Sequence, residues 1–115
     1  MSINQFVERL YLTALDRHYE ATGRDYWVGQ LNQGMSGSDV ARGFVHSPEF
    51  IGFGKNNDEF VDSLYLAICD RLPSDEERAN WTTALAAGTS RDQVINEFLA
   101  SAEWARLCAY YSVNV

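Results

Sequence analysis

The sequence has little of what many functional classes need. Its 115 residues include two prolines, two cysteines, two histidines and nine lysines or arginines, against sixteen aspartates or glutamates. The formal net charge of -7 and the scattered cations argue against binding to nucleic acid or to an anionic membrane. No apolar run approaches the roughly 20 residues of a membrane span, and the first residues lack the basic flank and apolar stretch of a signal peptide. We therefore expect neither membrane insertion nor a signal peptide.

Metal-binding and catalytic motifs are also missing. The two cysteines do not form a CxxC pair and the two histidines are isolated, which disfavours zinc. The carboxylates from Asp16 to Asp25 lack the spacing of a calcium loop, and no residue set has the pattern of a hydrolytic triad. We therefore predict no cofactor, no metal and no enzymatic activity. Cys69 and Cys108 fall among apolar residues, which favours free buried thiols, with one disulfide as the alternative.

What the sequence does contain is an internal duplication. A shift of 54 residues, the separation between Phe6 and Phe60, aligns the chain with itself without a gap. Roughly sixteen of about forty-five aligned positions are identical, whereas unrelated segments share about two or three. The identical pairs include Leu10 and Leu64, Asp16-Arg17 and Asp70-Arg71, Trp27 and Trp81, Gly34 and Gly88, Phe44 and Phe98, and Glu49 and Glu103. We expect one domain over residues 1-115, with repeats at about 4-54 and about 58-115.

Hydrophobic periodicity predicts three helices in each repeat. In the first repeat, one helix follows a cap at Asn4 and ends near Asp16, a second begins at Thr22, and a third follows Ser36. The second repeat begins its first helix at Asn57 or Asp58 and its middle helix at Ser74. Helices of about 12 residues cannot bury their apolar faces alone. The prediction is therefore an all-α fold without β-sheet, in which two tandem three-helix repeats pack as one pseudo-twofold domain around their first helices.

A Ser-x-Glu-aromatic motif closes both repeats, as Ser47-Pro48-Glu49-Phe50 and Ser101-Ala102-Glu103-Trp104. The serine is a typical helix cap, and a glutamate in the first helical turn interacts favourably with the helix dipole. We expect only a short helical turn after the first copy, before Gly52 and Gly54. After the second copy we expect a terminal helix that continues through Tyr110.

The recurring series of residues resembles a known family. It runs Phe-Val-x-x-Leu-Tyr, Asp-Arg, Trp-x-x-x-Leu-x-x-Gly-x-Ser and Phe-x-x-Ser-x-Glu-aromatic, and it resembles the bacterial domain of unknown function 4214 over nearly the whole chain. The second repeat fits best, whereas the first has His18-Tyr19-Glu20 where the family usually has Pro-Asp after the arginine. A fainter likeness exists to the helical linker domains of phycobilisomes. The resemblance implies an extracellular or cell-surface location in a large bacterial protein, and it implies no activity.

Two groups of residues are candidates for special roles. Arg17 with Glu49, and Arg71 with Glu103, are predicted to form structural ion pairs that join helices, rather than a ligand site. Trp27 and Trp81 are predicted to be core residues rather than platforms for sugars. The candidate interaction surface consists of aromatic residues, for which ordinary core packing is the alternative. These residues are Phe50, Phe53, Trp104, Tyr110 and Tyr111.

The functional expectation follows from these features. We expect a non-catalytic accessory or protein-interaction module within a larger bacterial secreted or cell-surface protein, whose partner is another protein module or a second copy. The alternative is a glycan-binding module that uses exposed aromatic side chains.

Overall fold

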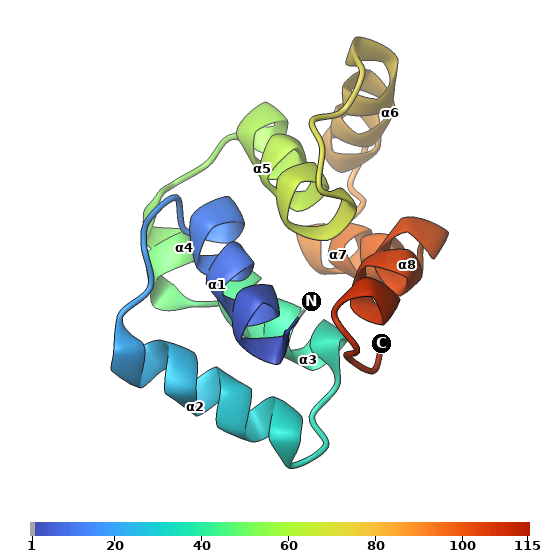
Figure 1. Ribbon diagram of the computed structural model, residues 1–115. Helices are drawn as coiled ribbons and strands as arrows, with labels where there is room; N and C mark the ends of the chain where they lie inside the picture. Colours follow the sequence, from blue (N-terminus) through green and yellow to red (C-terminus); the bar gives the residue numbers. More distant parts are fainter. Residues whose placement is uncertain (1) are drawn as a thin grey trace.

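The computed structural model describes residues 2-115, which form helices joined by short loops (Figure 1). The first repeat contains α1 (Ile3–Ala14), α2 (Ala21–Asn32), α3 (Gly37–Val45) and the short α4 (Pro48–Gly52). The second repeat contains α5 (Asn57–Leu64), the π-helical turn η1 (Tyr65–Cys69), α6 (Asp75–Ala86), α7 (Arg91–Leu99) and α8 (Ala102–Tyr110). Within residues 2-115 there is no β-strand, so the all-α prediction is confirmed.

Helix boundaries follow the capping residues, with two corrections to the sequence prediction, at the cap of α1 and the start of α2. The helix α1 is capped by Ser2 rather than Asn4, because Ser2 and Gln5 form a reciprocal capping box. Asn56 caps α5 in the same way, and this helix begins at Asn57, one of the two predicted starts. The helix α2 begins at Ala21 rather than Thr22. The first helix ends at Ala14 because Asp16 adopts a left-handed conformation with φ of 52°, which cannot continue a helix.

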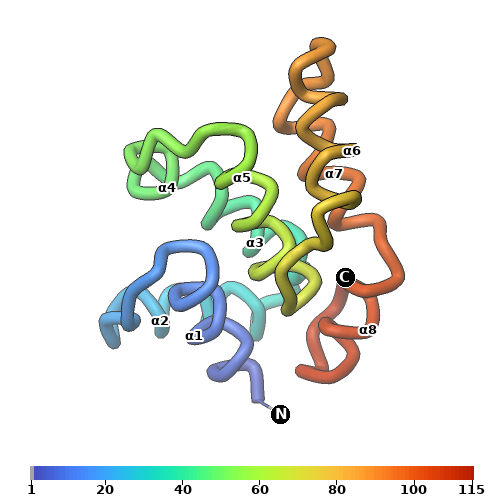
Figure 2. Tube along the Cα trace, turned by 90° about the horizontal axis from the view of Figure 1, so that it is seen from above, coloured from blue at the N-terminus to red at the C-terminus, as the bar shows by residue number. Residues whose placement is uncertain are grey.

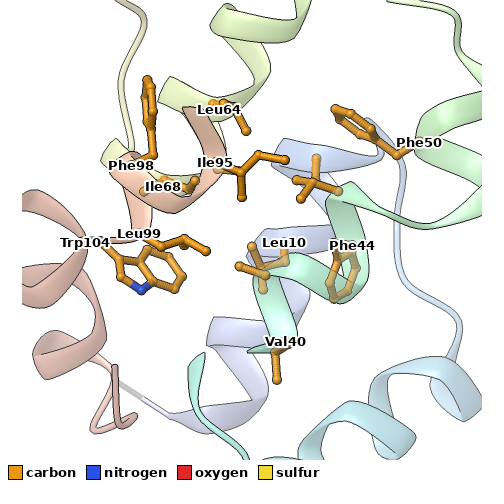
Figure 3. Close-up of a cluster of buried hydrophobic side chains, with 14 of the residues drawn as sticks. Leu10, Val40, Phe44, Phe50, Leu64, Ile68, Ile95, Phe98, Leu99 and Trp104 are labelled. Atoms are coloured by element: carbon orange, nitrogen blue, oxygen red, sulfur yellow. The ribbon is translucent and has the colours of Figure 1, made fainter. Parts of the chain in front are cut away.

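Both repeats contribute to one hydrophobic core (Figure 3). Its fully buried side chains include Phe6, Leu10 and Val40 from the first repeat and Phe60, Leu64, Ile68, Val94 and Trp104 from the second. The helix α1 packs against η1 and α5, so the first helices of the two repeats meet at the centre, as the sequence predicted. Neither repeat therefore has a complete core of its own.

Reciprocal contacts show that the two repeats are related by a pseudo-twofold axis. Phe6 contacts Trp104 at a ring-centroid distance of 5.8 Å, and the equivalent pair, Phe60 and Phe50, lies at 6.4 Å. Arg42 donates to the side-chain oxygen of Asn96, its own equivalent in the other repeat, at 3.2 Å. Two equivalent residues touch only where the axis passes between them. The helices α2 and α6 accordingly lie at opposite ends of the molecule in both views (Figures 1 and 2).

Candidate functional site

The first charged cluster joins the end of α1, the start of α2 and the start of α4. Arg17 donates through Nε and Nη2 to the carboxylate of Glu49 at 2.7 and 3.0 Å, and through Nη1 to Glu20 at 2.6 Å. The guanidinium also lies over the ring of Tyr11 at 5.0 Å. The hydrogen bonds from Arg17 lower the pKa of both carboxyl groups, Glu49 and Glu20.

The second repeat contains the same cluster with a different second acid. Arg71 donates to Glu103 at 3.1 Å and, through two nitrogens, to Glu77 at 2.8 Å each. These bonds from Arg71, together with the hydrogen bond from the backbone N–H of Ser74, lower the pKa of Glu77 to about 2. Both predicted ion pairs, Arg17 with Glu49 and Arg71 with Glu103, are therefore present. The N–H donors of each arginine are occupied by two acids from other helices. Each arginine therefore joins three helices, which is a structural role.

The candidate aromatic surface does not exist as one exposed patch. Phe50 is 4% exposed and Trp104 is fully buried, whereas Phe53 and Tyr110 are 44% and 60% exposed. The prediction of exposure is therefore wrong for Phe50 and Trp104, because each packs on the phenylalanine of the opposite repeat, Phe60 or Phe6. Trp104 also donates to Ser38 at 2.9 Å, which satisfies its indole N–H inside the core.

The remaining aromatic candidates separate into different regions. Tyr111 is half-buried against Phe6 and lies beside the exposed Tyr110 at the end of α8. Trp27 and Trp81 are half-buried and lie against the core residues Phe44 and Phe98 at centroid distances of 5.5 and 5.0 Å. Both tryptophans pack against the core and are partly buried, as predicted for core residues rather than for exposed platforms.

The two cysteines are free thiols. Cys108 is buried and Cys69 is half-buried. Burial, together with a hydrogen bond to Glu103, raises the pKa of the Cys69 thiol to about 12, and burial raises the pKa of Cys108 to about 11. Both side chains are therefore protonated at neutral pH, and neither has the thiolate character of a nucleophile. Within residues 2-115, no group of three or more His, Cys, Asp or Glu side chains is arranged to hold a metal ion.

A buried arginine between the repeats was not anticipated from the sequence. Arg9 donates to the backbone carbonyls of Ala67 and Leu66 at 2.7 and 2.9 Å and to the carboxylate of Asp70 at 3.2 Å. The π-helical turn and the left-handed Asp70, with φ of 58°, end the helix there. Carbonyls at a helix end lack intrahelical donors, so Arg9 satisfies them from the other repeat. The only feature of the sequence that could have indicated this contact is the presence of Arg9 beside the apolar face of its helix.

An apolar cleft with a volume of about 210 Å³ lies between the repeats. Its apolar lining comes from α3, α4, α5 and α7, and consists of Val45, Phe50, Ile51, Phe60 and Ile95. The rest of the lining consists of Gly54, the two cations Lys55 and Arg91, and the hydrogen-bonded pair His46 and Asp92. The sequence reasoning missed this cleft because its walls come from segments that are far apart along the chain.

A second groove, with a volume of about 490 Å³, lies beside α8. It is lined by Asp70 and Glu103, by Arg106 and by Tyr110 and Tyr111, among others. Its exposed tyrosine edge and mixed charges differ from the apolar floor of the cleft between the repeats.

The fold and the two charged clusters define a helical protein built from two tandem copies of one unit. The family model described as "Domain of unknown function (DUF4214)" matches residues 1–54 and again residues 52–108, and the chain therefore belongs to this family. The comparison with curated proteins and the comparison with solved structures gave no match. Within residues 2-115, no helix is long and apolar enough to cross a membrane.

Proposed function

We propose that the chain is a non-catalytic interaction module of a larger bacterial secreted or cell-surface protein. The observation that supports this is the apolar cleft between the repeats, at whose edge Ile51 is 66% exposed and the neighbouring Phe53 is 44% exposed. Exposed apolar groups around a concave surface are typical of protein contact sites. The resemblance to modules of large bacterial surface proteins supports the proposed context.

The strongly bonded charges are engaged in holding the fold. Arg17 and Arg71 join three helices each, and Arg24 and Arg78 pair with Glu8 and Asp62 in equivalent positions. Such fixed pairs are arranged for stability rather than for proton transfer. This arrangement supports a binding role over a catalytic one.

Site-specific photo-crosslinking in the full-length parent protein tests the proposal. A photoreactive residue at position 51 is expected to crosslink to a second protein module or a second copy. The matched control is position 72, because Leu72 is 57% exposed and does not line the cleft. Equal crosslinking from the two positions, or none from position 51, would argue against an interaction surface here.

The second candidate function is glycan binding at the groove beside α8. It is favoured by Tyr110, which is 60% exposed next to Asp70 and Arg106, because sugars bind to aromatic faces flanked by polar groups. A glycan array identifies a ligand if this function holds, and Tyr110→Ala then abolishes the signal. Tyr26→Ala is the control, since Tyr26 is 57% exposed in a different region.

A further inference from the structure

The pseudo-twofold relation shows that the cleft between the repeats has a filled counterpart in the other half of the molecule. A shift of 54 residues takes Phe60, on the cleft wall, back to Phe6, and takes Phe50 forward to Trp104. It likewise relates Gly54 to Cys108 and Arg91 to Gly37. The counterpart residues Phe6, Trp104 and Cys108 are fully buried. On the cleft side Phe60 and Phe50 are also buried, but Gly54 is exposed and a cleft remains beside it.

The counterpart is filled by the chain that follows Trp104. The helix α8 extends to Tyr110 and brings Cys108 into the core, and Tyr111 packs on Phe6 at 5.8 Å. Val113 then lies against Gly37, so closely that a Cβ at Gly37 would stand 2.8 Å from Cγ1 of Val113. The backbone oxygen of Asn114 accepts a hydrogen bond from the Gly37 N–H at 2.6 Å. A short non-helical segment with one aliphatic side chain and one oxygen acceptor therefore covers this half.

The first repeat has no equivalent covering segment. The helix α4 ends at Gly52, and Gly54 adopts a left-handed conformation with φ of 63°, after which the chain turns towards α5. Gly54 stands where the other repeat has the side chain of Cys108. A cleft of about 210 Å³ consequently remains on this side, with the buried side chains of Phe50, Phe60 and Ile95 at its floor and the exposed Ile51 at its edge.

The charges at the cleft edge favour an anion. Six of the nine lysines and arginines form ion pairs with acids, namely Arg9, Arg17, Arg24, Arg42, Arg71 and Arg78. Within residues 2-115, the cations without an acid partner are Lys55, Arg91 and Arg106, and the first two line this cleft. The cleft carboxylate Asp92 is hydrogen-bonded to His46 at 2.9 Å. In a protein of net charge -7, two unpaired cations at one edge are a local positive site.

Arg91 is also held in a defined position at this edge. Its guanidinium lies 4.5 Å from the ring centroid of Phe60, and Nη2 donates to the backbone oxygen of Lys55 and to Asn57 at 2.9 and 3.1 Å. The ammonium of Lys55 lies 5.4 Å from the ring centroid of Phe53. A positioned guanidinium retains free N–H donors for a carboxylate.

We propose that the cleft binds a short extended peptide segment of a partner protein, which inserts one aliphatic side chain and presents a neighbouring carboxylate to Lys55 and Arg91. The segment takes the place that the chain around Val113 takes in the other half. This inference rests on the proposed interaction function and specifies the chemistry of the partner.

A peptide titration tests the inference. The probe is an acetylated, fluorescent Tyr-Ser-Val-Asp peptide, which follows the order of Tyr111–Asn114 with aspartate as the last residue. Fluorescence polarisation is expected to show binding about tenfold tighter than for the same peptide with lysine in place of aspartate. A peptide with serine in place of valine is expected to bind about tenfold more weakly, because it buries no aliphatic side chain. Backbone NMR shifts on titration should centre on Ile51, Gly54 and Ile95.

Charge-reversal variants locate the anion site. Lys55→Glu and Arg91→Glu are each expected to abolish the preference for the aspartate peptide over the lysine peptide. Arg106→Glu makes the same change of charge away from the cleft, and the preference should remain. Arg91→Glu also removes the contact with Phe60 and could unfold the protein, which thermal unfolding detects. If it does unfold, the result for Lys55→Glu decides the test.

The inference is overturned if no peptide binds at about millimolar concentration, which corresponds to a very weak affinity. It is also overturned if the aspartate preference survives in Lys55→Glu, or if Arg106→Glu removes it as well. Crosslinking from position 51 without an aspartate preference rejects this inference and leaves the interaction function standing. If position 51 gives no specific crosslink and no peptide binds, both the interaction function and this inference are rejected.

Discussion

The two repeats share the same contacts among a tyrosine, a phenylalanine and an arginine, but their last helices, α4 and α8, differ in length. Tyr11 meets Phe44 edge-on at 4.9 Å, and the equivalent Tyr65 meets Phe98 at the same distance. In both repeats an arginine lies 5.0 Å above that tyrosine. By contrast, α4 spans five residues and α8 spans nine. The comparison indicates that the tyrosine, phenylalanine and arginine define the unit, whereas its last helix determines which half is closed and which keeps a cleft.

The start of the second helix also differs between the repeats. Ser74 and Glu77 form a capping box on α6, and the same Glu77 binds Arg71. At the equivalent positions α2 has Glu20 and Gly23, and no side chain caps the helix. A Cβ at Gly23 would collide with Tyr11 and Glu20, so glycine leaves room for the acid that replaces Glu77 as second partner of the arginine. Each arginine therefore has a second acid partner, but Glu20 and Glu77 occupy different positions of the repeat.

The largest expected difference between the halves concerns their buried aromatic residues. Trp104→Ala should lower the free energy of unfolding by about 4 kcal/mol, because a closed cavity forms in the core and Ser38 loses its donor. Phe50→Ala should cost about 2 kcal/mol, because the new space joins an open cleft that water can enter. Urea denaturation of both variants measures the two values. Equal losses would show that the cleft is as closed as its counterpart.

The next effect concerns the contact that crosses between the repeats. Arg9→Met should cost about 3 kcal/mol, since it leaves the carbonyls of Leu66 and Ala67 without a donor in a buried place. The equivalent residue of the second repeat is Ser63, and Ser63→Ala should cost less than about 1 kcal/mol. The same denaturation experiment compares them. A small loss for Arg9→Met would mean that water replaces the guanidinium at η1.

Features that depend on local chemistry were predictable from the sequence. The serine caps at Ser36, Ser47 and Ser101 are at the predicted residues, because a cap involves only the next three residues. The duplication predicted the shared core and the central first helices. The ion pairs were predictable because the same arginine and glutamate recur in both repeats.

Features that depend on the meeting of distant segments were not predictable. The burial of Phe50 and Trp104 follows from the crossed contacts of the pseudo-twofold axis, which periodicity within one helix does not reveal. The π-helical turn at Tyr65–Cys69 accompanies the bonds from Arg9, which lies in the other repeat. The cleft arises where Gly54 stands at the position equivalent to the buried Cys108 of the other repeat. In the sequence, only the difference between glycine at position 54 and cysteine at position 108 indicated the cleft.

A smaller effect is expected where the half-buried tryptophans meet the third helix of each repeat. Gly43 lies beneath Trp27, and a Cβ at Gly43 would collide with the indole ring. Gly43→Ala should therefore cost about 1 kcal/mol, although alanine favours a helix over glycine. The equivalent residue is the exposed Glu97, and Glu97→Ala should change stability by less than about 0.5 kcal/mol. Thermal unfolding compares the two, and a stabilised Gly43→Ala would show that Trp27 moves aside freely.

The smallest expected difference is the response of the two arginine clusters to acid. The carboxyl pKa of Glu77 falls from an ordinary 4.5 to about 2 in the folded state. A group with a lowered folded pKa contributes stability above its unfolded pKa and loses it as pH falls through the folded pKa. The melting temperature should therefore decline between about pH 5 and about pH 2.

Removing each acid in turn separates the two repeats. Glu77→Gln should flatten the decline in melting temperature more than Glu20→Gln does, because Glu77 accepts two bonds from Arg71 and one from the Ser74 N–H, whereas Glu20 accepts one bond from Arg17. Circular dichroism melts of the parent chain and both variants across this pH range measure the slopes. Parallel curves for all three proteins would mean that solvent screens both clusters equally, and that the capping box gives the second repeat no advantage in acid.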